Sequence, residues 1–298
     1  MNTCLAIDIG GTKIAAALIE SGQILQIEQC ETPSSNNPQD MTLVLRELID
    51  PYKERADFVA VASTGIIRKG VLTALNPDNL GGLNQYCLED ILSQICQKPV
   101  KVINDAQAAA WAEYNTLKSK ANAMGFITVS TGVGAGFVVN NSLLIGQHGI
   151  AGHAGHSLAD PNGPICGCGR QGCVESIASG TAIGKAGQVF FGSECTGKTV
   201  FEQYENGHVD AITIVERAAK TIANLIADLK ITLDLEVVCL GGSVGLAPGF
   251  LRLVHHYLSL LPPAYQVEVI PAHSRANSGL LGVASWIEHT FNKRISSQ

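Results

Sequence analysis

The sequence predicts an α/β protein built from two similar domains, and three observations lead to this prediction. The chain has 298 residues, which is more than the length at which a single hydrophobic core usually stops growing. Short apolar segments typical of strands alternate with longer segments of helical periodicity. A unit of strand, glycine turn, strand, tight turn and strand occurs twice, which indicates an internal duplication. We therefore expect two domains that enclose a central cleft.

The repeated unit begins each predicted domain. In the first copy the two turns are Gly10-Gly11-Thr12-Lys13 and Ser21-Gly22, and in the second they are Thr131–Gly136 and Asn140-Asn141. From this repeat we place the domain boundary near Thr116, with an N-terminal domain at 1–115 and a C-terminal domain at 116–298. The strands expected around the turns are Leu5–Ile9, Ile14–Ile19, Ile24–Ile27, Phe126–Ser130, Phe137–Val139 and Leu143–Ile145.

Hydrophobic periodicity places the other elements between and after the two copies. Helices are expected at Met41–Tyr52, Gln107–Tyr114, Ile212–Leu229 and Gly279–Glu288, and further strands at Phe58–Ala62, Val100–Ile103 and Glu236–Leu240. The final helix, at about 279–298, is expected to pack back onto the N-terminal domain.

The composition is typical of a globular protein that binds a small molecule. Hydrophobic residues make up 46% and charged residues 15%, which supplies a core and disfavours disorder. The net charge of -6, without a block of Lys or Arg, excludes a nucleic-acid partner. No apolar run is long enough for a membrane span, and no signal peptide is visible. Six of the nine cysteines are scattered through mostly apolar surroundings, which favours a reducing, cytoplasmic compartment.

Three strand-to-glycine turns have the residues that bind phosphate and magnesium. They are Asp8–Lys13, Ser130–Gly136 and Leu240–Gly245. Glycines allow backbone N–H groups to approach phosphate oxygens, and a carboxylate such as Asp8 can hold Mg²⁺ directly or through water. A plain hairpin turn is the alternative for any one of them. The spacing matches neither a P-loop nor a dinucleotide fingerprint, so the turns favour a nucleoside triphosphate bound in another way.

A cysteine cluster predicts a zinc site between 156 and 173. Cys166, Cys168 and Cys173 follow His156 in a segment rich in glycine, and three thiolates with one imidazole form the donor set of a closed tetrahedral zinc site. Three free thiols in a loop are the alternative. Because four protein ligands leave no position for an activated water, we expect the zinc to be structural. His153 and Glu175 lie beside the cluster in the sequence. Each could be a surface residue, could support the metal ligands, or could bind a substrate.

Asn104-Asp105 is the candidate catalytic pair. It lies where the strand Val100–Ile103 meets the following helix. Asp105 could accept backbone N–H groups as a helix N-cap, or it could accept the proton of an attacking hydroxyl during phosphoryl transfer. The residue types alone do not separate these two roles.

These motifs together resemble the ROK family of repressors, open-reading-frame proteins and sugar kinases, along nearly the whole chain. The resemblance is carried by Asp8–Lys13, Asn76–Gly81, Asn104-Asp105-Ala106, Ser130–Gly136, Cys166–Cys173 and Gly241-Gly242. It implies an actin-like, ribonuclease H-like fold of two domains, a homodimer, and phosphorylation of a hexose at its 6-hydroxyl by ATP with Mg²⁺.

The resemblance also implies roles for individual residues. Asp105 would be the general base, and His156, Cys166, Cys168 and Cys173 would bind zinc. The sugar would contact Gly65, Asn79, Asn104, Asp105, His153, His156 and Glu175. The nucleotide would contact Asp8, Gly10, Gly11, Thr12, Lys13, Thr131, Gly132, Val133, Gly134, Gly136, Gly241 and Gly242. For Lys13, an exposed lysine in a turn is an equal alternative.

One position departs from most ROK sugar kinases. They have Glu three residues before the zinc histidine, whereas this chain has His153. A neutral imidazole offers one donor and one acceptor, whereas a carboxylate only accepts, so sugar recognition should differ. The bacterial N-acetylmannosamine kinases of the family also have His there, which favours N-acetylmannosamine, released from sialic acid, as the substrate. A glucokinase, an N-acetylglucosamine kinase, a repressor and a non-catalytic sugar sensor are the alternatives.

Overall fold

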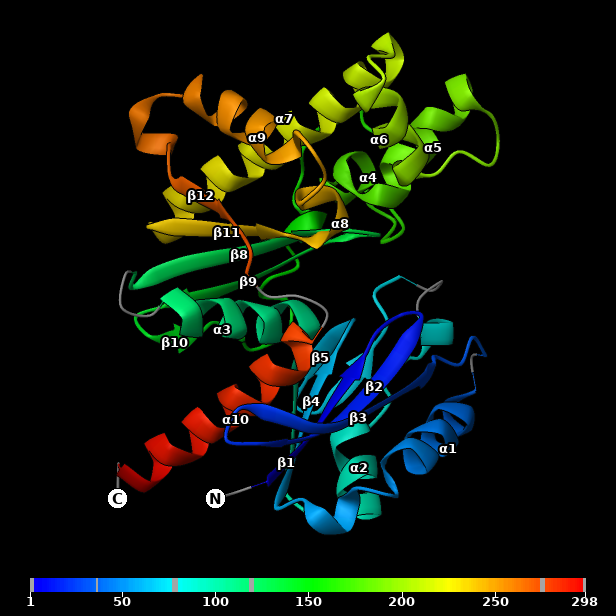
Figure 1. Ribbon diagram of the computed structural model, residues 1–298, viewed down its shortest axis with the longest axis vertical. Helices are drawn as coiled ribbons and strands as arrows, with labels where there is room; N and C mark the ends of the chain where they lie inside the picture. The colour runs from blue at the N-terminus through cyan, green and yellow to red at the C-terminus, as the bar shows by residue number, and fades with distance from the viewer. Residues whose placement is uncertain (1–2, 36, 77–79, 118–120, 274–276, 297–298) are drawn as a thin grey trace. The chain divides into compact units, whose positions relative to one another are not determined.

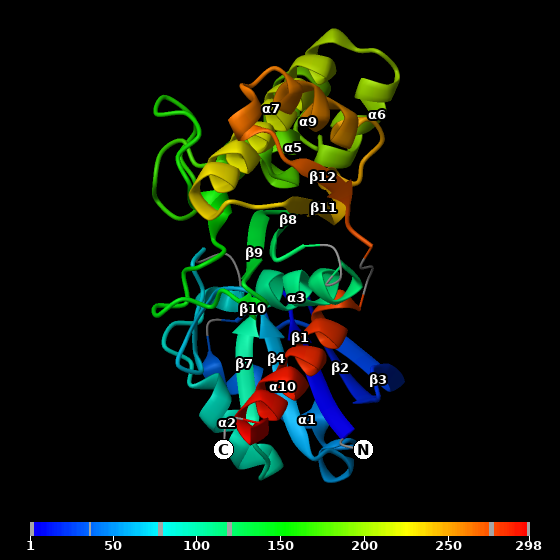
Figure 2. The same cartoon turned by 90° about the vertical axis from the view of Figure 1, so that its left-hand side faces the viewer.

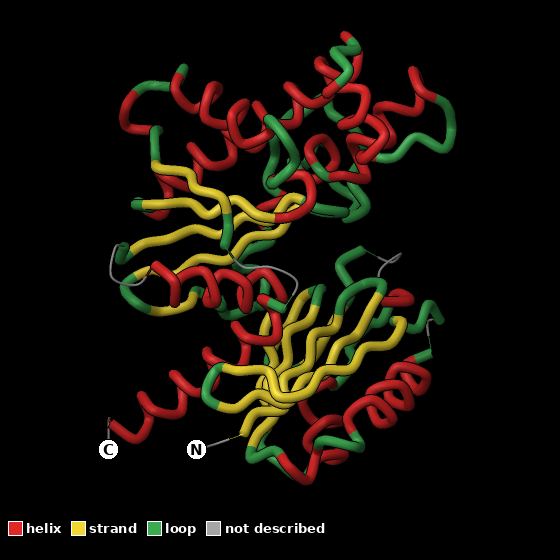
Figure 3. Tube along the Cα trace, viewed as in Figure 1, coloured by secondary structure: helices red, strands yellow, loops and turns green. Residues whose placement is uncertain are grey.

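The computed structural model describes residues 3–35, 37–76, 80–117, 121–273 and 277–296 (Figures 1 and 3). The chain forms two compact units. Unit 1 comprises Met1–Thr116, Ile145–Ala151 and Ser274–Gln298, and unit 2 comprises Leu117–Leu144 and Gly152–His273. The domain limits 1–115 and 116–298 stay a prediction.

Unit 1 is built around a five-stranded mixed sheet of order β3-β2-β1-β4-β7. The first three strands form an antiparallel meander, and β4 and β7 continue the sheet parallel to β1. The strands are β1 (Thr3–Ile9), β2 (Lys13–Glu20), β3 (Gln23–Glu31), β4 (Phe58–Ser63) and β7 (Val100–Asn104), and a separate hairpin pairs β5 (Ile66–Arg68) with β6 (Val71–Thr73).

Helices cover both faces of this sheet. The α-helices are α1 (Pro38–Ile49), α2 (Leu88–Cys96), α3 (Asp105–Leu117) and α10 (Ser278–Ser296), with 3₁₀ turns at Lys53–Arg55 and Leu80–Gly82. Leu5, Ile7 and Ile9 form one core with apolar residues of α1 and α2. Since side chains alternate along a strand, the residues between them face the other side, where α10 packs on β1 and β4 (Figure 2).

Unit 2 repeats the same sheet, with strand order β10-β9-β8-β11-β12. Again three antiparallel strands are followed by two that run parallel to the first. The strands are β8 (Ala123–Val129), β9 (Val133–Val139), β10 (Ser142–Leu143), β11 (Val237–Gly241) and β12 (Glu268–Pro271). Because β8 to β12 reproduce the connectivity of β1, β2, β3, β4 and β7, the predicted duplication is confirmed.

The helices of unit 2 pack into one large core with this sheet. They are α4 (Glu175–Ala178), α5 (Gly180–Phe191), α6 (Gly197–Glu205), α7 (Val209–Leu233), α8 (Gly242–Gly245) and α9 (Phe250–Ser259), with 3₁₀ turns at Ala154–His156 and Pro263–Tyr265. The long helix α7 buries Val215, Ile222 and Ile226 completely, as the periodicity predicts.

The predicted glycine turn Thr131–Gly136 is wrong from Val133 onward. Strand β9 begins at Val133, so Val133, Gly134 and Gly136 belong to a strand and the turn contains only Thr131 and Gly132. In the ladder of β8 and β9, Gly136 pairs with the aromatic residue Phe126, and Gly134 pairs with Thr128.

Among the described residues, no helix combines the length and the apolarity that would let it cross a bilayer.

Candidate active site and metal centre

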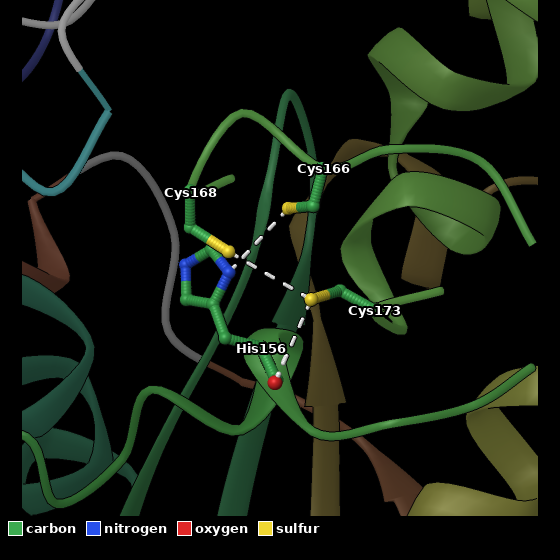
Figure 4. Close-up of side chains that lie close together, drawn as sticks. All are labelled: His156, Cys166, Cys168 and Cys173. Atoms are coloured by element: carbon green, nitrogen blue, oxygen red, sulfur yellow. Dashed lines mark hydrogen bonds between the residues drawn. The ribbon is translucent and has the colours of Figure 1, made fainter. Parts of the chain in front are cut away.

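The four predicted zinc ligands lie together in unit 2 (Figure 4). The donor atoms of His156, Cys166, Cys168 and Cys173 are all within 4.8 Å of one another. The Cys168 and Cys173 sulfurs are 3.8 Å apart, and the Cys166 sulfur is 3.6 Å from His156 Nδ1. Cys166 and Cys173 are buried, whereas His156 and Cys168 are partly exposed.

These separations fit a tetrahedral zinc ion. With Zn–S bonds of about 2.3 Å and a Zn–N bond of about 2.0–2.1 Å, the edges of a tetrahedron are about 3.8 Å between sulfurs and about 3.6 Å between sulfur and nitrogen. The two separations in this chain match these edges. Four protein donors complete the coordination, so the ion would have a structural role and would leave no open position for a reacting water.

The backbone between the ligands forces the sulfurs together. A tight turn is closed by the Cys166 N–H, which donates to Arg170 O, and by the Gly169 N–H, which donates to Cys166 O. Gly172 has φ +74°, and a Cβ there would lie 1.7 Å from Asp160 O. Only glycine can occupy this position, because both the backbone angle and the space exclude a side chain.

Asn104 and Asp105 lie at the start of α3 in unit 1, and Asn104 is the residue that caps the helix. Its Oδ1 accepts the N–H of Ala106 at 2.9 Å and of Gln107 at 3.4 Å. Its Nδ2 donates to Gly65 O at 3.1 Å. Asn104 therefore ties the Gly65 loop to the helix start, which is the capping role that the sequence left open for its neighbour Asp105.

Asp105 follows the capping residue, and its Oδ1 accepts the N–H of Ala106 at 2.8 Å. Burial raises the pKa of Asp105 above its ordinary value, against hydrogen bonds that lower it. A carboxylate with a raised pKa at the end of a parallel strand is a better proton acceptor than an exposed aspartate.

Asp8, at the end of β1, is the second perturbed carboxylate of unit 1. Burial, with the charge of Asp105 as a second cause, raises the pKa of Asp8 to about 7. The first turn of α10 touches it, because a Cβ on Gly279 would lie 2.3 Å from Asp8 Oδ2. Two neighbouring carboxylates, one of them next to a helix N-terminus, fit a site for a hydrated divalent cation.

Hydrogen bonds fix the base of the turn after Asp8, and the tip of the turn is exposed to solvent. The Gly10 N–H donates to Lys13 O at 2.9 Å, and Thr32 Oγ1 donates to Gly10 O at 2.7 Å. Gly11, Thr12 and Lys13 are exposed. The turn can therefore present backbone groups to a ligand, while the role of Lys13 stays a prediction.

In unit 2 the turns after β8 and β11 lie close together. Ser130 Oγ and Ser243 Oγ are 3.1 Å apart. Gly242 has φ +86°, and a Cβ there would lie 2.3 Å from Val129 O, so the backbone of the second turn packs directly on the end of β8. Gly241 ends β11 and Gly242 begins α8.

A cavity of about 920 Å³ opens beside these turns, entirely within unit 2. Its walls come from the turn after β8, from α5 and α6, and from the segment after β11. The lining residues include Thr131, Gly180, Lys185, Gln188, Cys195, Lys198, Phe201, Ser243 and Pro248. The sequence predicted only the parts of the wall that belong to the two turns, such as Thr131 and Ser243, because α5 and α6 have ordinary helical sequences and no motif marks them.

The predicted sugar ligands divide between the two units. Gly65, Asn104 and Asp105 belong to unit 1, whereas His153, His156 and Glu175 belong to unit 2, and Asn79 lies outside the described residues. The rings of His153 and His156 stack at a centroid distance of 6.4 Å.

Gln107 is a residue of unit 1 that the sequence prediction missed. It is buried, and its Nε2 donates to Ala151 O at 2.9 Å and Ile145 O at 3.3 Å. The side chain therefore closes the loop 145–151 on the first turn of α3. A glutamine in an Ala-rich helix gives no sequence signal for this contact.

Comparisons with known proteins identify what the chain is similar to. The model of the ROK family matches residues 4–290. A protein of Yersinia pseudotuberculosis serotype O:1b (strain IP 31758) with the name N-acetylmannosamine kinase is 52% identical over 287 residues, which cover 96% of this chain and 98% of that protein.

Solved structures show the same architecture. The ROK hexokinase from Thermus thermophilus matches with a TM-score of 0.85 at 28% identity, covering 97% of this chain and 99% of that one. A ROK family glucokinase from Streptomyces griseus, crystallised with glucose and AMPPNP, matches with a TM-score of 0.78 at 27% identity, covering 95% and 98%. The predicted fold, an actin-like α/β architecture of two domains, is confirmed.

Proposed function

The chain belongs to the ROK family, and on this premise we propose that it is an ATP-dependent N-acetylmannosamine kinase. The reaction would transfer the γ-phosphoryl group of ATP to the 6-hydroxyl of N-acetyl-D-mannosamine, giving N-acetylmannosamine 6-phosphate and ADP. The observation that carries this proposal is the similarity to the Yersinia N-acetylmannosamine kinase along nearly the whole chain.

Asp105 is the proposed general base. As the sugar oxygen attacks the γ-phosphorus, the bond from that phosphorus to the bridging oxygen of ADP breaks, and the hydroxyl proton passes to Asp105. The raised pKa of Asp105 and its place at the end of β7 support this role. A positioned base contributes about 10²–10⁴-fold, and the remaining acceleration comes from positioning and charge neutralisation.

The cavity of unit 2 is the proposed site for the base and ribose of ATP. Its volume of about 920 Å³ is within the usual range for a small-molecule site, and its mixed apolar and polar walls suit a nucleoside. The N–H groups of the turns after β1, β8 and β11 are the proposed phosphate donors. Among the twelve predicted nucleotide ligands, Val133 has its N–H already engaged by Glu175 at 2.8 Å.

Asp8 is the proposed ligand of Mg²⁺, directly or through water. When bound, Mg²⁺ would neutralise charge on the phosphate oxygens. Desolvation and, second, the charge of Asp105 raise the pKa of Asp8, and a bound cation would favour its ionised form. Zinc, by contrast, would be held by His156 and the three cysteines and would stabilise the loop that contains them.

His153 is the proposed specificity residue. An imidazole can donate one hydrogen bond and accept another, and this pattern differs from that of the glutamate that most ROK sugar kinases have at this position. We further propose that the protein acts in the cytoplasm in the degradation of sialic acid, and that it forms a homodimer, because the resemblance to the ROK sugar kinases implies these properties.

The test is ADP production by purified protein with Mg·ATP and, separately, N-acetylmannosamine, N-acetylglucosamine, glucose and mannose. The expected result is the highest kcat/KM with N-acetylmannosamine. The variant Asp105→Asn should lose kcat by roughly 10²-fold or more, because the base is lost. Preference for glucose or N-acetylglucosamine would overturn the proposed specificity. No ADP production with any of the four sugars would favour a sensor that binds sugar without turnover.

A further inference from the structure

Glu175 connects the metal centre of unit 2 to the turn after β8. It lies two residues beyond the ligand Cys173, at the first position of α4. Its Oε2 accepts the N–H of Val133 at 2.8 Å, and its Oε1 lies 4.0 Å from the sulfur of Cys166. One carboxylate therefore touches both a metal ligand and the backbone of the turn.

The segment before the metal ligand His156 also packs against this turn. Gly155 precedes His156, and a Cβ on Gly155 would lie 2.2 Å from Val133 O. A Cβ on Gly132 would lie 2.6 Å from Glu175 Oε2. Glycine is therefore required at position 155, where the backbone packs directly on the Val133 carbonyl, and the Glu175 carboxylate lies against Gly132.

The chain beyond Glu175 fixes the rest of the turn. The Gly180 N–H donates to Ser130 O at 2.7 Å, and Thr181 Oγ1 donates to Thr131 O at 2.9 Å. The turn itself is closed by the Ser130 N–H, which donates to Gly132 O at 2.9 Å. The N–H groups of Thr131 and Gly132 find no hydrogen-bond partner among the described residues, so they are available to an anion.

We propose that Glu175 is a positioning residue for the nucleotide phosphates. By accepting the Val133 N–H, its carboxylate keeps the N–H groups of Thr131 and Gly132 oriented toward the ligand. Through this side chain, the conformation of the metal centre influences the conformation of the nucleotide site. The identity of the nucleotide rests on the proposed function. This role differs from direct contact with the sugar, which is the role that family resemblance implies for Glu175.

The negative charge of Glu175 argues for a supporting role and against direct contact with the phosphates. A carboxylate that faced the phosphates would repel them, whereas this one is turned to the Val133 N–H and the Cys166 sulfur. A hydrogen bond to a charged acceptor is stronger than one between neutral groups, and a neutral amide of the same shape keeps the acceptor. The two substitutions Glu175→Ala and Glu175→Gln therefore separate loss of the contact from loss of the charge.

The experiment measures binding of Mg·ADP by calorimetry without sugar, zinc content by atomic absorption, and amide exchange of the peptide that contains Val133. Glu175→Ala should weaken Mg·ADP binding about tenfold or more, which follows from a charge-assisted hydrogen bond. Amide exchange at 131–133 should accelerate, while zinc stays at about one ion per chain. Glu175→Gln should restore Mg·ADP binding to within about threefold of the unchanged protein.

Two further variants complete the design. Cys168→Ser removes a metal ligand and should weaken Mg·ADP binding although it touches no nucleotide. Glu205→Ala, at the exposed end of α6, is the matched control for loss of a glutamate and should change neither Mg·ADP binding nor amide exchange at 131–133. If Cys168→Ser fails to fold, the comparison of Glu175→Ala with Glu175→Gln still tests the proposal.

The outcomes separate this inference from the proposed function. If Glu175→Ala binds Mg·ADP normally and only its KM for the sugar rises, Glu175 is a sugar ligand and the inference is overturned. Normal Mg·ADP binding with normal exchange at 131–133 also overturns it. If the unchanged protein binds no Mg·ADP, the proposed kinase function fails and this inference fails with it.

Discussion

Replacing Asp8 by Asn should stabilise the protein while abolishing its activity. Burial and the neighbouring charge of Asp105 raise the pKa of Asp8 from 3.8 to about 7. An aspartate with a raised pKa binds its proton more tightly in the folded state than in the unfolded state. Folding is therefore favoured below pH 3.8, and this contribution is lost as the pH rises to about 7. Asparagine has the same shape and never ionises, so it keeps the contribution at every pH.

The size of the effect follows from the two pKa values. The difference corresponds to about 4 kcal/mol, since each tenfold difference in proton affinity is about 1.4 kcal/mol. The first turn of α10, which touches Asp8 at Gly279, favours the ionised form and is already present in the folded state. We therefore take about 4 kcal/mol as the upper limit and expect about 2–4 kcal/mol at pH 8.

The assay compares urea unfolding of the unchanged protein and Asp8→Asn at pH 5 and pH 8. The gain should be largest at pH 8 and less than half as large at pH 5, where Asp8 is protonated in the folded state. Asp90→Asn, which neutralises an exposed carboxylate of α2, is the matched control and should shift stability by less than about 0.5 kcal/mol. An equal gain at both pH values would show that ionisation of Asp8 is not the cause, and a loss of stability at pH 8 would refute the reasoning.

Three other predictions follow from the site. Atomic absorption should find about one zinc per chain, and Cys168→Ser should lower both the zinc content and Tm; metal-free protein of unchanged Tm would contradict the assignment. Asn104→Ala removes the cap of α3 and the donor to Gly65 O, so urea unfolding should show a loss of about 1–2 kcal/mol, and a loss below about 0.5 kcal/mol would argue against the capping role. Gly242→Ala should cost more than about 2 kcal/mol in the same measurement, because its Cβ would lie 2.3 Å from Val129 O. Gly22→Ala, with φ +76° and open space around it, is its control and should cost only about 1 kcal/mol; equal losses would show that the steric clash is not the cause.

Most of the fold could be predicted from the sequence because strand and helix patterns depend on local hydrophobic periodicity. The buried apolar run of β1 and the apolar face of α7 are both visible in the sequence. The duplication was visible because both copies keep a turn after their first strand. The start of β9 was not, because Gly134 and Gly136 have low strand propensity and are tolerated only through the opposite strand, with Phe126.

The cluster of candidate metal ligands could be predicted fully and the candidate catalytic site only in part. Packing alone seldom requires three cysteines and a histidine at such close spacing, so the sequence alone predicted that these four residues lie together. Asn104 and Asp105 are adjacent and chemically similar, and only the hydrogen bonds show that Asn104 caps α3. Gln107 and the walls of the unit 2 cavity could not be found, because their roles depend on chain segments far away in the sequence.

The two perturbed carboxylates of unit 1, Asp8 and Asp105, connect stability with function. Desolvation and, second, the charge of Asp105 raise the pKa of Asp8, which costs folding free energy at neutral pH. Hydrophobic packing does not require such a pair, because apolar or amide side chains at the same positions would remove the cost. A bound cation would offset the cost at Asp8, and a proton taken from a substrate hydroxyl would offset it at Asp105. The free energy that the unliganded protein gives up at these two residues is therefore recovered when cation and substrate are bound, and this is the arrangement expected of a phosphoryl-transfer site.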